Sequence, residues 1–326
     1  MTDKTSKVSI DDTFKAILKT DLTRASISVC LASTIGENEQ PVYQRLQITD
    51  DLTAEFRQVV QDVLSRYGGD FEQGEAVLRK YDPGAKLDGH EIAHIDLSEK
   101  GFVLDQIEGL GELSSMERFA AEVEFISHLR FYVIIVEKKK GDYIYFFRSY
   151  SEKRELGRSK LFAALMSRGQ YDSVKQSVFL FDRNLDCVSR GDDLFIFSQD
   201  KFQKIFQFFE MVKRSAEKVL KKVKEAVPID NFDAFADSCR GHLQKLAKLN
   251  NIAAKPYFSK LTIDDIKKVT TKHEDLQSII VKKDGKEMLS FDAKDKWAIL
   301  RVLDDDYLDS IMTGQSYEVN SKRQLK

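Results

Sequence analysis

Two apolar segments joined by a short polar turn constrain the fold of this chain more than any other feature. Residues 131–136 (FYVIIV) and 143–147 (YIYFF) consist of β-branched and aromatic residues, and a polar EKKKGD turn joins them. Such residues favour strands, and a Gly-Asp turn between two apolar runs is typical of a β-hairpin. A hairpin this apolar must be covered, so we predict a sheet that packs against helices.

The hairpin belongs to a larger block, residues 129–223. A basic segment, RSYSEKRELGRSK, follows at 148–160, and a second strand pair is predicted at 178–182 and 193–197. A long helix is predicted from about Lys201, because apolar residues recur with gaps of three and four as far as Val223.

This long helix has a second interpretation. Its apolar residues follow the a/d heptad pattern of paired helices over about three heptads. We therefore identify five of them as candidate self-association residues: Phe202, Ile205, Phe209, Val212 and Val219. The alternative is an ordinary core helix whose lysine-rich faces contact solvent.

The N-terminal part mixes strand and helix patterns. Paired strands are predicted at 25–32 and 41–49, an amphipathic helix at 51–67 that ends at Gly68-Gly69, and a strand at 91–97.

Near the C-terminus, residues 278–291 predict a hairpin with a two-residue Asp284-Gly285 turn, and a helix follows around Trp297. We therefore predict an α+β fold with mixed or antiparallel sheets, β-hairpins and packed helices, and one long helix near the centre of the chain.

Charge divides the chain into an acidic front and a basic rear. Residues 36–124 contain 8 Lys/Arg and 20 Asp/Glu, whereas 125–160 (9 against 4), 201–224 (8 against 2) and 240–286 (11 against 5) are basic. Fields of opposite sign favour partners of opposite sign. The polar stretch GELSSMER precedes the hairpin, so we predict an acidic α/β domain at 1–124 and a basic α+β domain at 125–326.

Composition also bears on the compartment. The longest apolar run, 131–136, is far shorter than the roughly 20 residues of a membrane-spanning helix. The N-terminus, MTDKTSKVSI, lacks the apolar core of a signal peptide. Cys30, Cys187 and Cys239 are widely spaced and form no CxxC pair, which favours reduced thiols over disulfides or a zinc site. We expect a cytoplasmic protein without a cofactor.

The string HEIAH, from His90 to His94, matches the HExxH motif of zinc hydrolases, in which two histidines bind the metal and the glutamate is the general base. The motif functions on a helix, where residues i and i+4 share a face. Here Ile92, Ile95 and Leu97 fit a strand at least as well, and no third ligand follows at metzincin spacing. A zinc hydrolase stays an alternative.

Glu137 and Lys139 match the E-x-K half of a metal-dependent nuclease site. The other half, an aspartate after a proline on a preceding strand, is missing, so a solvated turn is the competing interpretation. Phosphate-binding loops, dinucleotide fingerprints and nucleophile motifs are absent from the sequence. We therefore expect no catalytic residues, no metal and no enzymatic activity, and keep a metal-dependent nuclease as an alternative.

The basic segments favour nucleic-acid binding, because phosphate contacts need only cations placed along a track. The candidate DNA-binding residues are Arg148, Lys153, Arg154, Arg158, Lys160, Lys245, Lys248, Lys267 and Lys268. An acidic partner would select the same pattern. A non-catalytic protein–protein adaptor, whose acidic front half binds a basic or membrane-embedded partner, is therefore another alternative.

Two parts of the central block resemble a known family. They are FRSYSEKRELGRSKLF, which includes the basic segment, and the strand–strand–helix pattern QSVFLFDRNLDCVSRGDDLFIFSQDKFQKIFQF. Both are similar to KwaB, the soluble subunit of the two-component Kiwa anti-phage defence system of bacteria, and the resemblance weakens before Ala120.

The resemblance implies a cytosolic DNA-binding protein that self-associates as a homodimer or higher homo-oligomer. It also implies docking on a membrane-embedded partner, KwaA, and it carries no catalytic residues over to this chain. We therefore expect an anti-phage defence protein that binds double-stranded DNA with little sequence preference and is recruited to the inner membrane by its partner.

Overall fold

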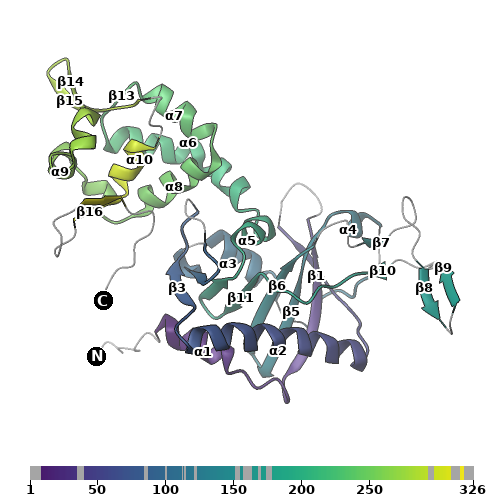
Figure 1. The fold of residues 1–326 in the computed structure, drawn as a ribbon. Coiled ribbons are helices and arrows are strands. Elements are labelled where there is room, and N and C mark those ends of the chain that lie inside the picture. The colour runs from purple at the N-terminus through teal and green to yellow at the C-terminus, as the bar shows by residue number, and fades with distance from the viewer. Residues whose placement is uncertain are drawn as a thin grey trace, which may run out of the picture. The chain divides into compact units, whose positions relative to one another are not determined.

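The structure is a computed structural model that describes residues 9–34, 40–83, 87–99, 101–111, 113, 115–120, 123–150, 155–156, 164–167, 170–173, 178–292, 297–309 and 316–318. The fold is α+β, as predicted, and the chain forms two compact units (Figure 1). Unit 1 comprises Met1–Lys80 and Leu87–Phe206, and unit 2 comprises Tyr81–Lys86 and Gln207–Lys326.

Unit 1 is built on a sheet in which eight of the described strands follow the order β2-β1-β5-β6-β11-β12-β4-β3. Neighbouring strands are antiparallel except for β3 and β4, which are parallel. The strands are β1 (Ser26–Ser33), β2 (Val42–Arg45), β3 (Val77–Lys80), β4 (Glu91–Asp96), β5 (Leu129–Lys139), β6 (Asp142–Ser149), β11 (Cys187–Arg190) and β12 (Asp193–Ile196).

The predicted central hairpin is confirmed as β5 and β6, with Ile134 opposite Phe146. On its other edge, β5 pairs with β1, so Ile134 also lies opposite Val29. Residues before and after position 124 therefore contribute to one sheet. The two compact units are divided after Phe206 rather than at the predicted boundary after Glu124.

One face of the sheet is covered by α1 (Ile10–Leu18) and α2 (Asp50–Glu72), and α2 runs across the strands in Figure 1. Apolar residues recur along α2 at helical spacing, and Phe56, Val60 and Val63 are buried against the sheet. Gly68-Gly69 does not end the helix as predicted. The cost of glycine in a helix is only about 1 kcal/mol each, and the longer helix places Phe71 against Phe14, with 5.2 Å between ring centroids.

The other face packs against α5 (Gln199–Ile205) and the residue after it. Phe206 lies 5.3 Å from Phe147 of β6 and 6.4 Å from Phe131 of β5, measured between ring centroids. Gln106, in α3 (Gly101–Glu108), donates through its amide to the backbone oxygen of Phe206 at 3.2 Å. The sheet of unit 1 is thus the middle layer of three.

The second predicted strand pair differs from the structure. β12 does not pair with residues 178–182; its partners are β11 and β4. Residues 178–179 form β10 (Val178–Phe179), which pairs with β7 (Glu155–Leu156), and β8 (Ala164–Ser167) pairs with β9 (Gln170–Ser173). The short helix α4 (Val123–Ser127) precedes β5.

The predicted long helix consists of two helices, α5 and α6 (Phe208–Ala226), separated at Gln207 (φ 48). Residues on either side of the break belong to different cores. Phe206 is buried in unit 1, whereas Phe208 contacts Tyr81 in unit 2, with 5.5 Å between ring centroids. The apolar period continues across the break because each helix buries one face.

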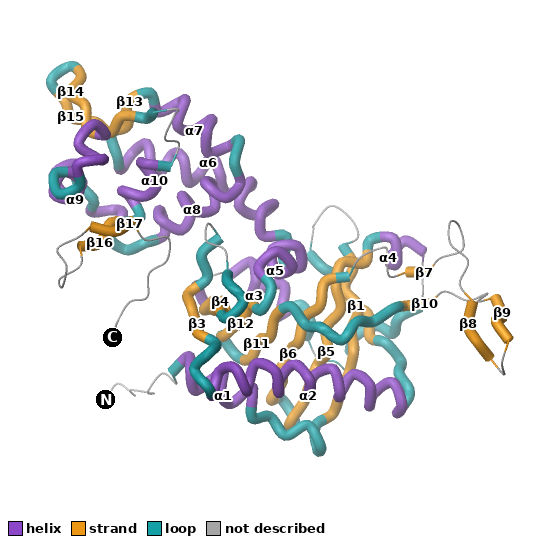
Figure 2. Tube along the Cα trace, viewed as in Figure 1, coloured by secondary structure: helices purple, strands orange, loops and turns teal. Residues whose placement is uncertain are grey.

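Unit 2 is a cluster of helices with a small sheet (Figure 2). β15 (Lys286–Ser290) pairs antiparallel with β14 (Ile280–Lys283) and parallel with β13 (Ile229–Asp230). The predicted C-terminal hairpin is therefore confirmed. The other elements are α7 (Phe232–Arg240), α8 (Leu243–Ala254), α9 (Ile263–Thr270), α10 (Ala298–Leu303), β16 (Tyr307–Asp309) and β17 (Ser316–Glu318).

Candidate nucleic-acid interface

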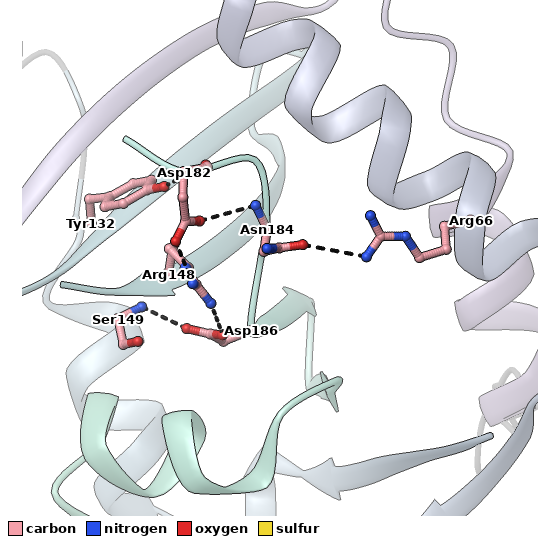
Figure 3. A network of polar contacts seen from close by, with 7 residues as sticks. All are labelled: Arg66, Tyr132, Arg148, Ser149, Asp182, Asn184 and Asp186. Carbon is pink, nitrogen blue, oxygen red and sulfur yellow. Dashed lines mark hydrogen bonds and ion pairs between the residues drawn. The ribbon is translucent and has the colours of Figure 1, made fainter. Parts of the chain in front are cut away.

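Arg148, at the end of β6, lies inside unit 1, with 8% of its surface exposed (Figure 3). Its guanidinium donates to the carboxylates of Asp182 and Asp186, at 2.5 Å each. The backbone N–H of Ser149 donates to the second oxygen of Asp186 at 2.7 Å. Burial raises the pKa of Asp186, although Ser149 and Arg148 both favour its ionised form.

These contacts bring together the two ends of the segment 150–181, because Ser149 precedes this segment and Asp182 follows it. The Tyr132 hydroxyl adds a hydrogen bond to the backbone oxygen of Asp182 at 3.3 Å. Arg148 as a DNA contact stays a prediction, and a phosphate would have to displace two ion pairs to reach it. The other predicted contacts in this region, Lys153, Arg154, Arg158 and Lys160, lie outside the described residues.

Lys245 and Lys248, two more predicted DNA contacts, are buried on α8, with 2% and 7% of their surfaces exposed. Lys245 donates to the Ser238 hydroxyl at 2.8 Å. Lys248 lies between Asp306 at 2.7 Å and Asp304 at 3.0 Å. Burial opposes its charge, but the two carboxylates outweigh burial and raise the pKa of Lys248. Both lysines hold the helices of unit 2 together, and their role in DNA binding stays a prediction.

Lys267 and Lys268 lie on α9, which begins with a capping box formed by Thr262 and Asp265. Lys268 has 74% of its side chain exposed and pairs with Asp265 at 2.8 Å. Lys267 forms an ion pair with Glu287 of β15. This ion pair ties α9 to the β14–β15 hairpin, so Lys267 lies close to the lysines of the hairpin.

Three exposed lysines that we did not predict as DNA contacts occupy the end of this hairpin: Lys282, Lys283 and Lys286. Asp284 (φ 50) and Gly285 (φ 78) form the turn, with the two positive φ angles of a type I′ hairpin. Lys283 is therefore directly opposite Lys286. The spacing KKDGK already contained this signal, because a two-residue turn fixes which flanking residues face each other.

We call Lys267, Lys268, Lys282, Lys283 and Lys286 the basic hairpin surface. Nearby carboxylates pair with three of them, and Lys283 contacts Asp230 at 2.9 Å. Within the described part of the chain, no carboxylate forms an ion pair with Lys282 or Lys286. Like charges directly opposite each other destabilise a hairpin, and the ion pair with Asp230 offsets this for Lys283 but not for Lys286.

The predicted self-association residues are covered by the chain itself. Phe202 and Ile205 of α5 have no exposed surface, Val212 and Val219 of α6 are 3% and 7% exposed, and Phe209 is partly buried. Their role in self-association stays a prediction. A subunit contact through them would require α5 or α6 to leave its own core.

Residues Glu91 to His94 of HEIAH lie in strand β4 and His90 lies in the turn before it, which confirms the strand interpretation of the sequence. The ring of His94 is buried, and its Nε2 lies 2.7 Å from Asp193 of the neighbouring strand β12. The described residues contain no group of three or more histidine, cysteine, aspartate or glutamate side chains that could hold a metal ion. The helical frame that a zinc hydrolase requires is therefore not formed here.

Glu137 and Lys139, the nuclease alternative, lie at the turn end of the β5–β6 hairpin. Glu137 accepts a hydrogen bond from the backbone N–H of Gly141 at 3.4 Å, and Lys139 is exposed. This is the geometry of a hairpin turn, the interpretation that competes with the nuclease pair.

None of the helices that the structure describes is long and apolar enough to cross a bilayer.

Fold and surface together define an α+β protein with a basic hairpin in its C-terminal unit. The chain belongs to the KwaB family, because the family model described as Kiwa protein KwaB-like matches residues 126–313, more than half of its length. The resemblance noted in the sequence is thereby confirmed, and the family places the chain in Kiwa anti-phage defence. Neither the curated proteins nor the solved structures contain a match.

Proposed function

We propose that this protein binds double-stranded DNA with little sequence preference, through the basic hairpin surface of unit 2. The observation that carries the proposal is the pair Lys283 and Lys286, which face each other across the hairpin, and Lys282 adds a third exposed charge at the same end. Among the described residues no carboxylate forms an ion pair with Lys282 or Lys286, so the charges of these two lysines can contact a phosphate without breaking a salt bridge.

The chemistry of these side chains favours the DNA backbone over the bases. A lysine ammonium is a compact charge that contacts any phosphate, whereas base recognition uses planar or bidentate groups. The basic hairpin surface contains lysines alone. Counterion release then supplies the affinity, and affinity falls steeply as salt rises.

A salt titration of duplex binding tests the proposal. Each lost phosphate contact lowers the slope of log K against log salt by about 0.9. Replacing Lys282, Lys283 and Lys286 with glutamine is therefore expected to weaken binding and to reduce the slope by nearly three. The control replaces Lys15, Lys201 and Lys204, three exposed lysines of unit 1, with glutamine. Equal slopes for both triple variants would reject the hairpin as the interface.

The basic segment at 148–160 is a second part of the proposed interface. Reversing Arg154 and Arg158 to glutamate is expected to weaken binding to all duplex sequences alike, because phosphate contacts do not depend on the bases. Unchanged affinity would remove this segment from the interface and leave the hairpin as its site.

We also propose, from membership of the family, that the protein acts as a homodimer or higher oligomer in the cytoplasm and is recruited to the inner membrane by a membrane-embedded KwaA-like subunit. Light scattering of the purified chain measures its mass in solution. Co-purification with a co-expressed KwaA-like subunit, from detergent-solubilised membranes, tests recruitment. A monomer that stays in the supernatant when both subunits are expressed would reject this assembly.

A further inference from the structure

The turn end of the β5–β6 hairpin in unit 1 carries a second concentration of positive charge. Lys138, Lys139 and Lys140 are consecutive and all exposed. None of the three forms an ion pair with a residue that the structure describes. The two carboxylates at this end are engaged elsewhere: Glu137 accepts a hydrogen bond from Gly141, and Asp142 pairs with Arg190 at 3.3 Å. The charge of the lysine run is therefore directed to solvent.

Two tyrosines follow the lysines on the same hairpin. Tyr143 and Tyr145 are two residues apart on β6, so both side chains lie on one face of the sheet. Their ring centroids are 6.0 Å apart with 32° between the ring planes, and both residues are partly exposed. We call Lys138, Lys139, Lys140, Tyr143 and Tyr145 the Tyr–Lys platform.

We propose that the Tyr–Lys platform binds a single strand of nucleic acid, with phosphates on the lysines and unpaired bases on the tyrosine rings. Cations beside adjacent aromatic rings are the two components of single-strand binding sites. A duplex cannot use the rings, because its bases are already stacked and paired. A bilayer surface is a poorer match. Binding to lipid uses large apolar side chains that protrude from the surface, and the exposed ones among the described residues lie outside this hairpin.

The lysines are tested by the salt dependence of binding to a short fluorescent oligodeoxythymidylate. Each phosphate contact to a single strand contributes about 0.7 to the slope of log K against log salt. The double variant Lys138→Gln, Lys140→Gln is expected to lower the slope by about 1.4. Lys201→Gln with Lys204→Gln removes the same charge from α5 of the same unit and is expected to leave the slope unchanged. Equal slopes for the two variants overturn the proposal.

The tyrosines are tested by comparing loss of the ring with loss of the hydroxyl. Stacking is sequence-tolerant and depends on the ring, so Tyr143→Ser and Tyr145→Ser are each expected to weaken oligonucleotide binding about tenfold. Tyr143→Phe and Tyr145→Phe keep the ring and are expected to bind within about twofold of the wild type. If the serine and phenylalanine variants bind alike, the rings do not stack on bases. Thermal unfolding of each variant shows whether unit 1 is intact. If a serine variant unfolds unit 1, the phenylalanine and lysine variants still test the proposal.

Two further measurements separate this proposal from other interpretations. Binding to vesicles with and without phosphatidylserine, in the absence of nucleic acid, tests a lipid surface. If the serine variants lose vesicle binding and keep oligonucleotide binding, the platform proposal is overturned. The proposal does not depend on duplex binding by unit 2: the Lys282, Lys283, Lys286 variant is expected to retain single-strand binding, and the platform variants to retain duplex binding. If one set of variants abolishes both activities, the platform is not a separate site.

Discussion

Replacing Arg148 with methionine removes the cation from a buried ion-pair network of unit 1 while keeping most of the side-chain volume. The Arg148 side chain is 10% exposed and that of its partner Asp186 only 2%, whereas the Asp182 side chain is 26% exposed and so keeps part of its hydration. Breaking a buried pair by removing one partner costs about 3–5 kcal/mol, because it leaves an uncompensated buried charge. A domain has a free energy of unfolding of about 5–15 kcal/mol, so the variant loses a large share of it.

The matched control is Arg183→Met, which breaks a pair with Glu55. Both of its side chains are mostly exposed, at 65% and 63%, and exposed pairs contribute only about 0–1 kcal/mol. Both variants lose one arginine close to the same turn. Burial is the main difference between them.

The two units can be followed separately in a denaturant titration. The single tryptophan, Trp297, lies in unit 2, so its fluorescence reports that unit alone. Cys187, next to Asp186 in unit 1, is buried, and its labelling by a thiol reagent reports the opening of unit 1. We expect Arg148→Met to shift the Cys187 labelling midpoint strongly and the tryptophan midpoint little. Equal shifts for Arg148→Met and Arg183→Met would refute the reasoning.

The stability that Arg148→Met loses also depends on pH. Because burial raises the folded-state pKa of Asp186, its contribution to stability is present below the unfolded pKa, near 3.8, and declines as pH rises through the folded value. Without Arg148, ionisation of Asp186 becomes costlier still. The cost of Arg148→Met is therefore expected to be greater at neutral pH than in weak acid, and Asp186→Asn in the Arg148→Met background should restore part of the stability.

Two further predictions concern other buried groups. Burial opposes the ionisation of Asp304, but Lys255 and Lys248 outweigh it and lower its pKa, so its contribution is present above about pH 4 and is lost as pH falls through the folded pKa. Asp304→Asn should therefore destabilise unit 2 at neutral pH and weaken its acid dependence, measured by tryptophan fluorescence; an unchanged neutral-pH midpoint would contradict this. Burial raises the pKa of Cys30 and Cys239 to about 12 and that of Cys187 well above its ordinary value, so all three thiols should react with a thiol reagent only after unfolding; a fast-reacting thiol in the native protein at pH 7 would contradict that.

Local patterns predicted the elements that depend on neighbours in sequence. The β5–β6 hairpin and the Asp284-Gly285 hairpin were both predicted, because alternation and turn chemistry act over a few residues. The pairing of β12 was not. Its partner β11, with the sequence CVSR, is short and half polar, so the sequence pattern favours the more apolar segment at 178–182.

Charge was a poorer guide to exposure, for a physical reason. Arg148 and Lys248 come from basic segments, which indicate solvent-facing residues. Each is buried because carboxylates distant in sequence surround it: Asp182 and Asp186 for Arg148, and Asp304 and Asp306 for Lys248. Such partnerships are fixed by the fold. The two-residue turn beside Lys283 is a local feature, so the sequence alone could have indicated the lysines that flank it.

The contacts of Arg148 also separate the register of the sheet from the length of the chain between Tyr150 and Phe181. Both ends of that stretch are attached to the sheet through Arg148 and Asp186, so changes in its length do not alter the register of β6 or β11. Doubling a loop adds only about 0.6 kcal/mol of closure entropy. Insertions, deletions and transplanted sequences at this position are therefore compatible with the sheet.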